Sequence, residues 1–217
     1  MGELTRRERE YLEKKEAVIS KAAELFCKYG FEKVSMDTIA RESEFTKKTI
    51  YRYFTCKEDL FFAAALKSYQ QLLDTMKRKS RKGKTGFEKI RLSYYAYHDY
   101  YFKFPQLAQL INMSGIIKSR SEDVEVPYRE KFLDLDRCLF DHLIQMFQEA
   151  RIDRSIRSDL DASTLALSSV FVATGFFQML SLSGNTYTNH FDLDQEGFVK
   201  FTIEMLLDSL KDRQDSE

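Results

Sequence analysis

Five side chains that can donate hydrogen bonds or carry positive charge lie close together in the sequence: Lys47, Lys48, Thr49, Tyr51 and Arg52. On a short helix that starts after Thr46, they share the outer side, because Ile50 and Phe54 can face inward at helical spacing. Lysine and arginine bind phosphates and guanine edges in DNA. A helix of this composition therefore has the chemistry to bind a nucleic acid.

A second short helix precedes this one at the spacing of a helix-turn-helix. Ser35 is a predicted N-cap for a helix at Met36–Ser43, and Thr46 is a predicted N-cap for Lys47–Phe54. Between them lies a turn of three residues, Glu44-Phe45-Thr46. This unit would place the N-terminal residues of its second helix at base edges in the major groove.

The positive charge needed for such binding is local. The chain has 34 basic and 34 acidic residues, so its formal net charge is zero. Between residues 33 and 57, however, six basic residues (Lys33, Arg41, Lys47, Lys48, Arg52 and Lys57) outnumber three acidic ones (Asp37, Glu42 and Glu44). Affinity for DNA responds to the charge near the phosphates, so a neutral total does not exclude it.

The rest of the sequence predicts helices and no strand. Apolar residues recur at spacings of three and four, and the chain has only two prolines. Gly30 is the predicted left-handed cap of the first helix, Pro105 and Pro127 each start a helix, and residues 118–126 form a polar loop. The predicted helices are Arg9–Tyr29, Met36–Ser43, Lys47–Phe54, Lys57–Lys82, Phe87–Phe102, one that begins at Pro105, Pro127–Ala150, Ala162–Leu182 and Leu193–Asp212.

These patterns predict an all-α fold of about nine helices in two domains. Residues 1–56 would form an N-terminal three-helix domain that contains the helix-turn-helix. Residues 57–217 would form a larger C-terminal helical domain, and the long helix from Lys57 to Lys82 would link the two.

The run from Phe31 to Leu60 resembles the DNA-binding signature of the TetR (tetracycline repressor) family. Its most specific parts are Thr49-Ile-Tyr-Arg-Tyr-Phe54 and Lys57-Glu-Asp-Leu60, and the match covers about residues 10–62. The resemblance implies a cytoplasmic one-component regulator, a repressor in the first interpretation. It would bind a palindromic double-stranded DNA operator as a homodimer and leave it when a small molecule binds.

The resemblance also implies DNA contacts for individual residues. Tyr51 and Lys57 would touch phosphates, and the first residues of the recognition helix would meet bases. The complete candidate set is Ser35, Thr38, Thr46, Lys47, Lys48, Thr49, Tyr51, Arg52 and Lys57. Two positions depart from the common family pattern, which often has glycine at both. Glu44 in the turn predicts strain or a different turn shape, because a left-handed non-glycine residue costs about 1–2 kcal/mol. Lys48 adds a cation where DNA is expected.

Aromatic residues are frequent after Lys82, and Ile90, Tyr94, Tyr97 and Tyr101 form one helical stripe. The resemblance implies a cavity among these helices, and aromatic walls with few polar groups suit an apolar or aromatic ligand, including a cationic one over tyrosine faces. The candidate lining residues are Phe62, Leu66, Tyr94, Tyr97, His98, Tyr101, Met113, Phe140, Phe171 and Gln178.

The uncharged helix Ala162–Leu182 and the last helix suit a buried interface, and the resemblance implies a four-helix interface between two chains. The candidate interface residues are Phe176, Phe198, Phe201 and Met205. A two-fold dimer would present two recognition helices to half-sites about one DNA turn apart.

No catalytic constellation, metal-ligand spacing or cofactor motif is found, so we expect no enzyme activity, no metal and no cofactor. The three cysteines are scattered, which indicates a reducing compartment, and the charged N-terminus has no signal-peptide core. Three alternatives stay open: a helical ligand-binding protein or enzyme that uses no DNA, a membrane-associated protein suggested by the uncharged residues 162–191, and an activator instead of a repressor.

Overall fold

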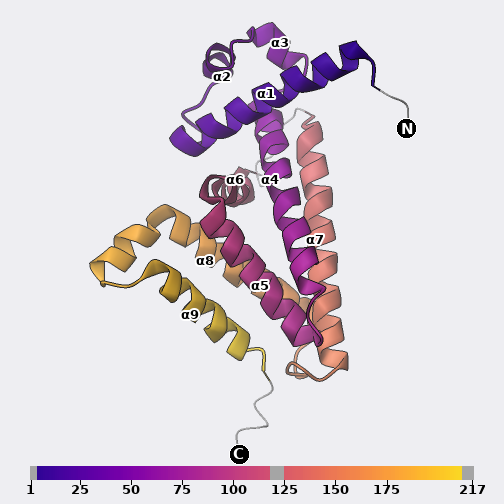
Figure 1. Ribbon diagram of the computed structural model, residues 1–217, viewed down its shortest axis with the longest axis vertical. Coiled ribbons are helices and arrows are strands. Elements are labelled where there is room, and N and C mark those ends of the chain that lie inside the picture. Colours follow the sequence, from indigo (N-terminus) through magenta and orange to yellow (C-terminus); the bar gives the residue numbers. More distant parts are fainter. Residues whose placement is uncertain (1–3, 118–124, 212–217) are drawn as a thin grey trace, which may run out of the picture. The chain divides into compact units, whose positions relative to one another are not determined.

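The computed structural model describes residues 4–117 and 125–211 (Figure 1). Within these residues every regular element is a helix, which confirms the predicted all-α class. The nine helices of the described residues are α1 (Arg6–Tyr29), α2 (Met36–Glu42), α3 (Lys47–Tyr51), α4 (Lys57–Ser80), α5 (Gly86–Lys103), α6 (Pro105–Ile117), α7 (Pro127–Ile152), α8 (Ala162–His190) and α9 (Gln195–Asp208).

Two helix ends that differ from the prediction can be described by local side-chain contacts. Helix α1 begins at Arg6, earlier than expected, because Thr5 and Glu8 form a reciprocal capping box. Helix α8 continues past Leu182 to His190, and within this extension the hydroxyls of Ser183 and Thr188 donate to carbonyls four residues earlier, a geometry compatible with a helix. Most of the predicted polar loop, residues 118–124, and the predicted helix end at Asp212 lie outside the described residues.

The cap after α1 also differs in detail from the prediction. Gly30 has the expected positive φ, 80°, but its ψ of 157° is extended and not left-handed helical. This region of backbone space is open almost only to glycine. The predicted left-handed helical conformation of Gly30 is therefore wrong, and what the structure requires of glycine here is the positive φ.

The chain divides into two compact units. The first comprises the described residues within Met1–Tyr69 and Gln106–Leu135, and the second those within Gln70–Pro105 and Asp136–Glu217. Helices α4 and α7 contribute residues to both units.

An aromatic cluster forms the core of the first unit. The rings of Phe26, Phe31 and Phe61 lie 5.3–5.6 Å apart between centroids, and they join α1 to the first turns of α4. Ile39 of α2 and Ile50 of α3 are both fully buried. The two short helices are thus held by their apolar undersides.

The second unit is held by contacts between helices that are distant in sequence. Tyr97 of α5 packs on Phe177 of α8, with ring centroids 4.4 Å apart. Glu204 of α9 accepts hydrogen bonds from the Arg91 guanidinium, at 3.0 Å, and from the Tyr95 hydroxyl, so it ties α9 to α5. At the start of α5, the backbone N–H of Gly86 donates to Asp153 at 2.6 Å, and Gly86 lies against the backbone of Ala150 in α7.

Candidate nucleic-acid interface

Side-chain caps define both short helices of the first unit. The Ser35 hydroxyl accepts a hydrogen bond from the backbone N–H of Thr38 at 3.1 Å, and the Thr46 hydroxyl accepts one from Thr49 at 3.1 Å. The hydroxyls of Thr38 and Thr49 also pair with those of their caps. Four of the predicted DNA-contact residues therefore also have a structural role at the helix starts.

The turn between α2 and α3 contains a left-handed residue. Glu44 has a φ of 60°, its N–H bonds the carbonyl of Arg41 at 3.3 Å, and the N–H of Phe45 bonds the carbonyl of Ala40 at 3.1 Å. This pair of bonds is a Schellman motif, whose left-handed position is most often glycine. The strained turn that the sequence predicts is therefore present, because Glu44 adopts the left-handed conformation that glycine usually occupies at this position.

The outer side of α3 is exposed and mostly cationic. Lys47, Lys48, Tyr51 and Arg52 are exposed, while Thr49 is half-buried at the helix start. Figure 1 shows α2 and α3 on the same side of α1, within the first unit. The arrangement predicted from the spacing, an apolar underside with an outward basic face, is thus present in the structure.

These cations differ in what they contact. The Lys47 ammonium lies 2.9 Å from a carboxylate oxygen of Asp37, which raises the pKa of Lys47 through their hydrogen bond and charge attraction. Lys48 has no ion pair among the described residues. The Arg52 guanidinium donates to the Tyr53 hydroxyl at 3.2 Å and lies over the same ring.

Lys57 is anchored more firmly than the sequence suggested. Its ammonium donates to the carbonyl of Phe31 at 3.1 Å and lies 4.1 Å from the centre of the Phe31 ring. An ammonium has three donors. Lys57 therefore attaches the segment after α1 to the start of α4 through one donor, and its half-buried ammonium keeps two further donors.

A buried carboxylate joins this part of the chain to α7. Asp59, which is 2% exposed, accepts hydrogen bonds from the backbone N–H of Thr55 at 3.1 Å and of Tyr128 at 2.8 Å. The Thr55 hydroxyl donates to the carbonyl of Glu125 at 2.9 Å. The N-terminal turn of α7 is therefore attached to the segment that follows α3. The sequence contained no signal for this joint, since its partners are about seventy residues apart.

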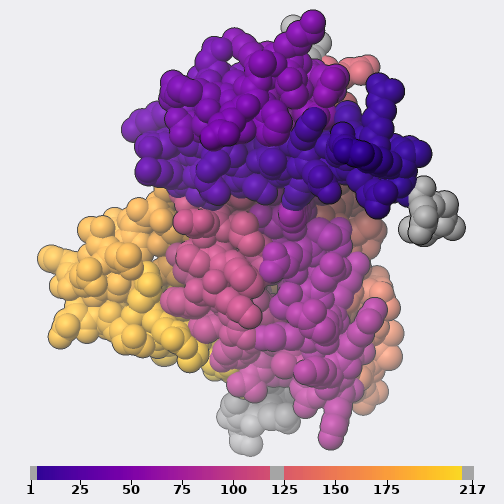
Figure 2. Space-filling view, turned by 45° about the horizontal axis from the view of Figure 1, so that its top comes forward, coloured from indigo at the N-terminus to yellow at the C-terminus, as the bar shows by residue number. Residues whose placement is uncertain are grey.

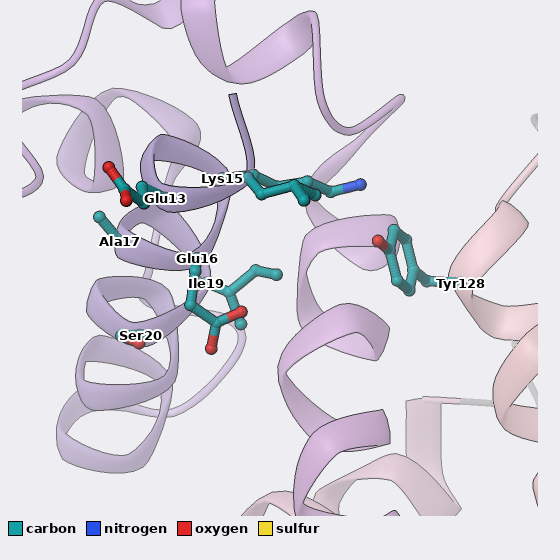
Figure 3. A pocket seen from close by; sticks show the side chains of 8 residues that line it. Glu13, Lys15, Glu16, Ala17, Ile19, Ser20 and Tyr128 are labelled. Carbon is teal, nitrogen blue, oxygen red and sulfur yellow. The ribbon is translucent and has the colours of Figure 1, made fainter. Parts of the chain in front are cut away.

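A groove of about 650 Å³ lies beside the same joint, between α1 and the start of α7 (Figure 3). The Lys15 ammonium extends across it to the Tyr128 ring, 5.0 Å from the ring centre. Its lining residues are Leu12, Glu13, Lys15, Glu16, Ala17, Ile19, Ser20 and Tyr128. None of them is among the residues predicted to line a ligand cavity.

The residues predicted to line a ligand cavity are divided between the two units. Phe62, Leu66 and Met113 belong to the first unit, and the remaining residues belong to the second. Phe62 is fully buried, and Leu66 and Met113 are half-buried.

Within the second unit, the predicted residues of α5 lie in an aromatic environment. Burial raises the pKa of Tyr97, and Tyr101 lies 5.2 Å from Phe177 between ring centres. The Tyr94 hydroxyl donates to the carbonyl of Ser169 at 3.3 Å, which ties α5 to α8, and burial raises the pKa of Tyr94. Three of the predicted lining residues thus face the interior of one helical unit.

His98 has an unusual environment for a buried polar side chain. It is 4% exposed, and its Nδ1 lies 3.0 Å from a carboxylate oxygen of Asp99. Its Nε2 has no hydrogen-bond partner among the described residues. Phe140 and Gln178, by contrast, are only half-buried.

Phe171 does not fit the predicted cavity lining. Its side chain is 69% exposed in the described chain, so it cannot enclose a ligand within its own unit. The helical spacing that placed it near the aromatic stripe does not distinguish an inward face from one left open for another chain.

Phe171 lies on an exposed apolar stripe of α8 that also includes Leu167, Met179 and Leu182. On α9, the predicted interface residues Phe198, Phe201 and Met205 are exposed at spacings of three and four, and Phe176 packs on Phe198 with ring centroids 5.9 Å apart. Helices α8 and α9 lie side by side in Figure 1, and their orange-to-yellow surface is continuous in Figure 2. We define the α8–α9 apolar face as the exposed side chains of Leu167, Phe171, Met179, Leu182, Phe198, Phe201 and Met205.

Helix α8 is also long and apolar enough to cross a membrane, judged by length and composition. It has 29 residues, its most apolar window has a mean hydropathy of 1.7, and 28% of that window is buried in the chain. An apolar helix that is mostly uncovered needs a partner, which a lipid bilayer or another protein surface could supply.

Two short capped helices joined by a Schellman turn, with a buried underside and a basic outer face, define a DNA-binding protein of the helix-turn-helix class. Residues 18–64 match the family model described as bacterial regulatory proteins, tetR family. These residues therefore carry the DNA-binding domain that this family model describes, as the resemblance predicted. A comparison with curated proteins gives no match.

Solved structures of regulators share the fold over nearly the whole chain. A tetR-family regulatory protein from Rhodococcus RHA1 has a TM-score of 0.69 and 15% identity, over 91% of this chain and 97% of that one. FadR from Bacillus subtilis, in complex with stearoyl-CoA, has a TM-score of 0.70 and 17% identity, over 90% and 98%. AibR, in complex with isovaleryl-CoA and operator DNA, has a TM-score of 0.66 and 18% identity, over 89% and 98%. At these identities the similarity establishes the fold.

Proposed function

We propose that this protein is a cytoplasmic one-component repressor. Residues 1–56 would form its DNA-binding domain and residues 57–217 its ligand-binding and dimerisation domain. The observation that carries this proposal is α3, which exposes Lys47, Lys48, Tyr51 and Arg52 above a fully buried underside. Such a helix can enter a major groove without unfolding its support.

The α8–α9 apolar face supports the proposal of a homodimer. An exposed stripe of this kind on a folded chain is costly in water, and a second copy would cover it with the same stripe by two-fold symmetry. Two copies would also double the basic surface and present two recognition helices to a palindromic operator. In such a dimer the second chain covers the apolar side of α8, so a lipid bilayer is not required to cover it.

The effector in this proposal is a small apolar or aromatic molecule that binds among the aromatic residues of α5 and α8. FadR and AibR are recorded with acyl-CoA ligands, so stearoyl-CoA and isovaleryl-CoA are suitable first probes. Release from DNA requires that the ligand prefer the conformation that binds DNA poorly, because equal affinity for both conformations shifts nothing. Helix α4 contributes to both compact units, so it is the element through which we expect this preference to act.

The direct test is a gel shift with the DNA upstream of the protein's own gene. Lys48→Ala and Tyr51→Ala should each weaken the complex at fixed salt, while Lys211→Ala, which removes an exposed cation of the second unit, should not. A protein that binds no duplex even in dilute salt would favour the alternative of a helical ligand-binding protein or enzyme. A requirement for detergent would favour the membrane alternative, and a transcription assay separates repression from activation.

A further inference from the structure

The ion pair between Lys47 and Asp37 connects the two helices of the helix-turn-helix at their outer surface. Lys47 is the first residue of α3, and Asp37 lies in the first turn of α2. Their charged atoms are 2.9 Å apart, and their side chains are 48% and 73% exposed. Wherever the Lys47 ammonium meets DNA, a carboxylate is therefore beside it.

This neighbour changes what Lys47 can bind. A phosphate attracts the ammonium but repels the carboxylate, so the pair gains little from the DNA backbone. Lys48, which has no ion pair among the described residues, gains the full attraction. The ion pair therefore suits a surface that offers an acceptor and a donor next to each other, which base edges do and phosphates do not.

The major-groove edge of a G·C pair has this pattern. Guanine presents two acceptors, N7 and O6, and cytosine presents the N4 donor. O6 accepts a hydrogen bond from N4 within the base pair, so these atoms are about 2.9 Å apart. That separation matches the distance between the charged atoms of Lys47 and Asp37. The ammonium can bind the guanine edge while the carboxylate accepts from cytosine.

An A·T pair suits the ion pair less well. Adenine places its N6 donor between its own N7 acceptor and the O4 acceptor of thymine, and the thymine methyl group lies beyond O4. A carboxylate at N6 would be next to N7, and an ammonium at O4 would be next to the methyl group. We propose that Lys47 and Asp37 together recognise one G·C base pair in each operator half-site, an inference that rests on the proposed DNA-binding function.

The test is selection from a random pool of duplexes, with the full-length wild-type protein, Asp37→Ala, Lys47→Ala and Glu42→Ala. Glu42 is a matched control, because it is an exposed acid of α2 that is paired with Arg41 and not with a residue of α3. The wild type should select a G·C pair at one position of each half-site. Asp37→Ala and Lys47→Ala should both lose this preference there and keep the others, and Glu42→Ala should keep all of them.

Binding to single duplexes then gives the size of the effect. Replacing that G·C pair by A·T should weaken wild-type binding by about tenfold or more, and should change the binding of Asp37→Ala by less than about threefold. On a duplex of unrelated sequence, Asp37→Ala should bind more tightly than wild type, because Lys47 is then free to bind a phosphate.

Two results would overturn the inference and leave the proposed function in place. In one, both variants retain the wild-type preference at every position. In the other, Lys47→Ala alone loses a preference, which would mean that Lys47 acts without Asp37. A wild-type protein that enriches no sequence and binds no duplex would instead overturn both proposals. Thermal unfolding of each variant confirms that the exposed substitutions leave the fold intact.

Discussion

The carboxylate of Asp59 accepts a hydrogen bond from the backbone N–H of Tyr128 at 2.8 Å, and with it the start of α7 is attached to the start of α4. The same carboxylate holds the N–H of Thr55, directly after the helix-turn-helix. A buried anion is stable only with such partners. The first turn of α7 and the segment that follows α3 therefore cannot move independently unless this carboxylate loses a donor.

Asp59→Asn should lower the free energy of unfolding by about 2 kcal/mol, because an amide can accept through one oxygen only and leaves a buried N–H without a partner. Urea titration measures the loss, and amide hydrogen exchange at Thr55 and Tyr128 should become faster. Glu58→Gln is the control: it makes the same change of charge one residue earlier, without these two bonds. Equal unfolding of both variants would contradict the assigned role of Asp59.

Glu44→Gly should raise the free energy of unfolding by about 1 kcal/mol, since it removes the side-chain strain of a residue at a φ of 60°. The gain is partly offset by the greater freedom of glycine in the unfolded chain. Glu42→Gly, in the last turn of α2, is the matched control and should lower stability. A destabilised Glu44→Gly variant would mean that the glutamate side chain has a stabilising contact in the turn.

Gly86→Ala should destabilise the second unit by about 3 kcal/mol, because an added methyl group would overlap the backbone of Ala150. Gly115→Ala in α6 tests the opposite case, since a methyl group there meets nothing within 4 Å. It should stabilise the protein by about 0.5–1 kcal/mol through better helix propensity. Chemical denaturation measures the free energy of unfolding of each variant. Similar free energies for Gly86→Ala and Gly115→Ala would show that α5 can shift away from α7.

Cys27 should react slowly with thiol reagents. Burial raises the pKa of this thiol from its ordinary 9.0 to about 11, and the thiol donates to the carbonyl of Gln106 at 3.1 Å. The thiolate is the reactive form, so exposed Cys138 should be labelled first at mildly alkaline pH, as mass spectrometry can show. Labelling of Cys27 as fast as Cys138 would contradict the burial of this thiol.

The same shift gives a pH dependence of stability. Between pH 9.0 and about 11 the folded chain keeps the Cys27 proton that the unfolded chain loses. The contribution of this thiol is therefore complete below pH 9.0 and is lost as the pH rises through that window. Over the same pH range, the free energy of unfolding of the wild type should fall relative to that of Cys27→Ala. A difference that stays constant would contradict the shift.

Phe171→Glu and Phe201→Glu should convert a dimer to a monomer in analytical ultracentrifugation and weaken operator binding. Both side chains are more than two-thirds exposed in one chain, so neither change should unfold it. Ile152→Glu is the control, because Ile152 is an apolar side chain with 83% exposure outside the α8–α9 apolar face. Retention of the dimer in both phenylalanine variants would exclude this face as the interface.

Local patterns in the sequence were sufficient to predict the helix-turn-helix. The capping bonds of Ser35 and Thr46 connect atoms three residues apart, and the inward side of Ile39 and Ile50 follows from helical spacing. The unusual turn at Glu44 could be predicted too, because a Schellman position is defined by its distance from the helix end. For these residues, the local sequence contains the physical cause.

Contacts between distant segments could not be predicted in this way. The joint between Asp59 and Tyr128 depends on which N–H the fold brings to the carboxylate, and the ion pair of Lys47 with Asp37 depends on the angle between two helices. The sequence predicts a cavity position for Phe171, because an apolar residue at helical spacing looks the same whether its own chain or another covers it. Periodicity marks an apolar face without naming its partner.

The α8–α9 apolar face has a consequence for how much of this protein a cell must make. If this face is buried only in a dimer, a monomer exposes apolar surface to water. The melting temperature of the protein then rises with protein concentration. Newly synthesised copies would then be most vulnerable to aggregation and proteolysis when they are scarce. The number of chains per cell would set both the supply of folded molecules and the fraction of binding sites they occupy.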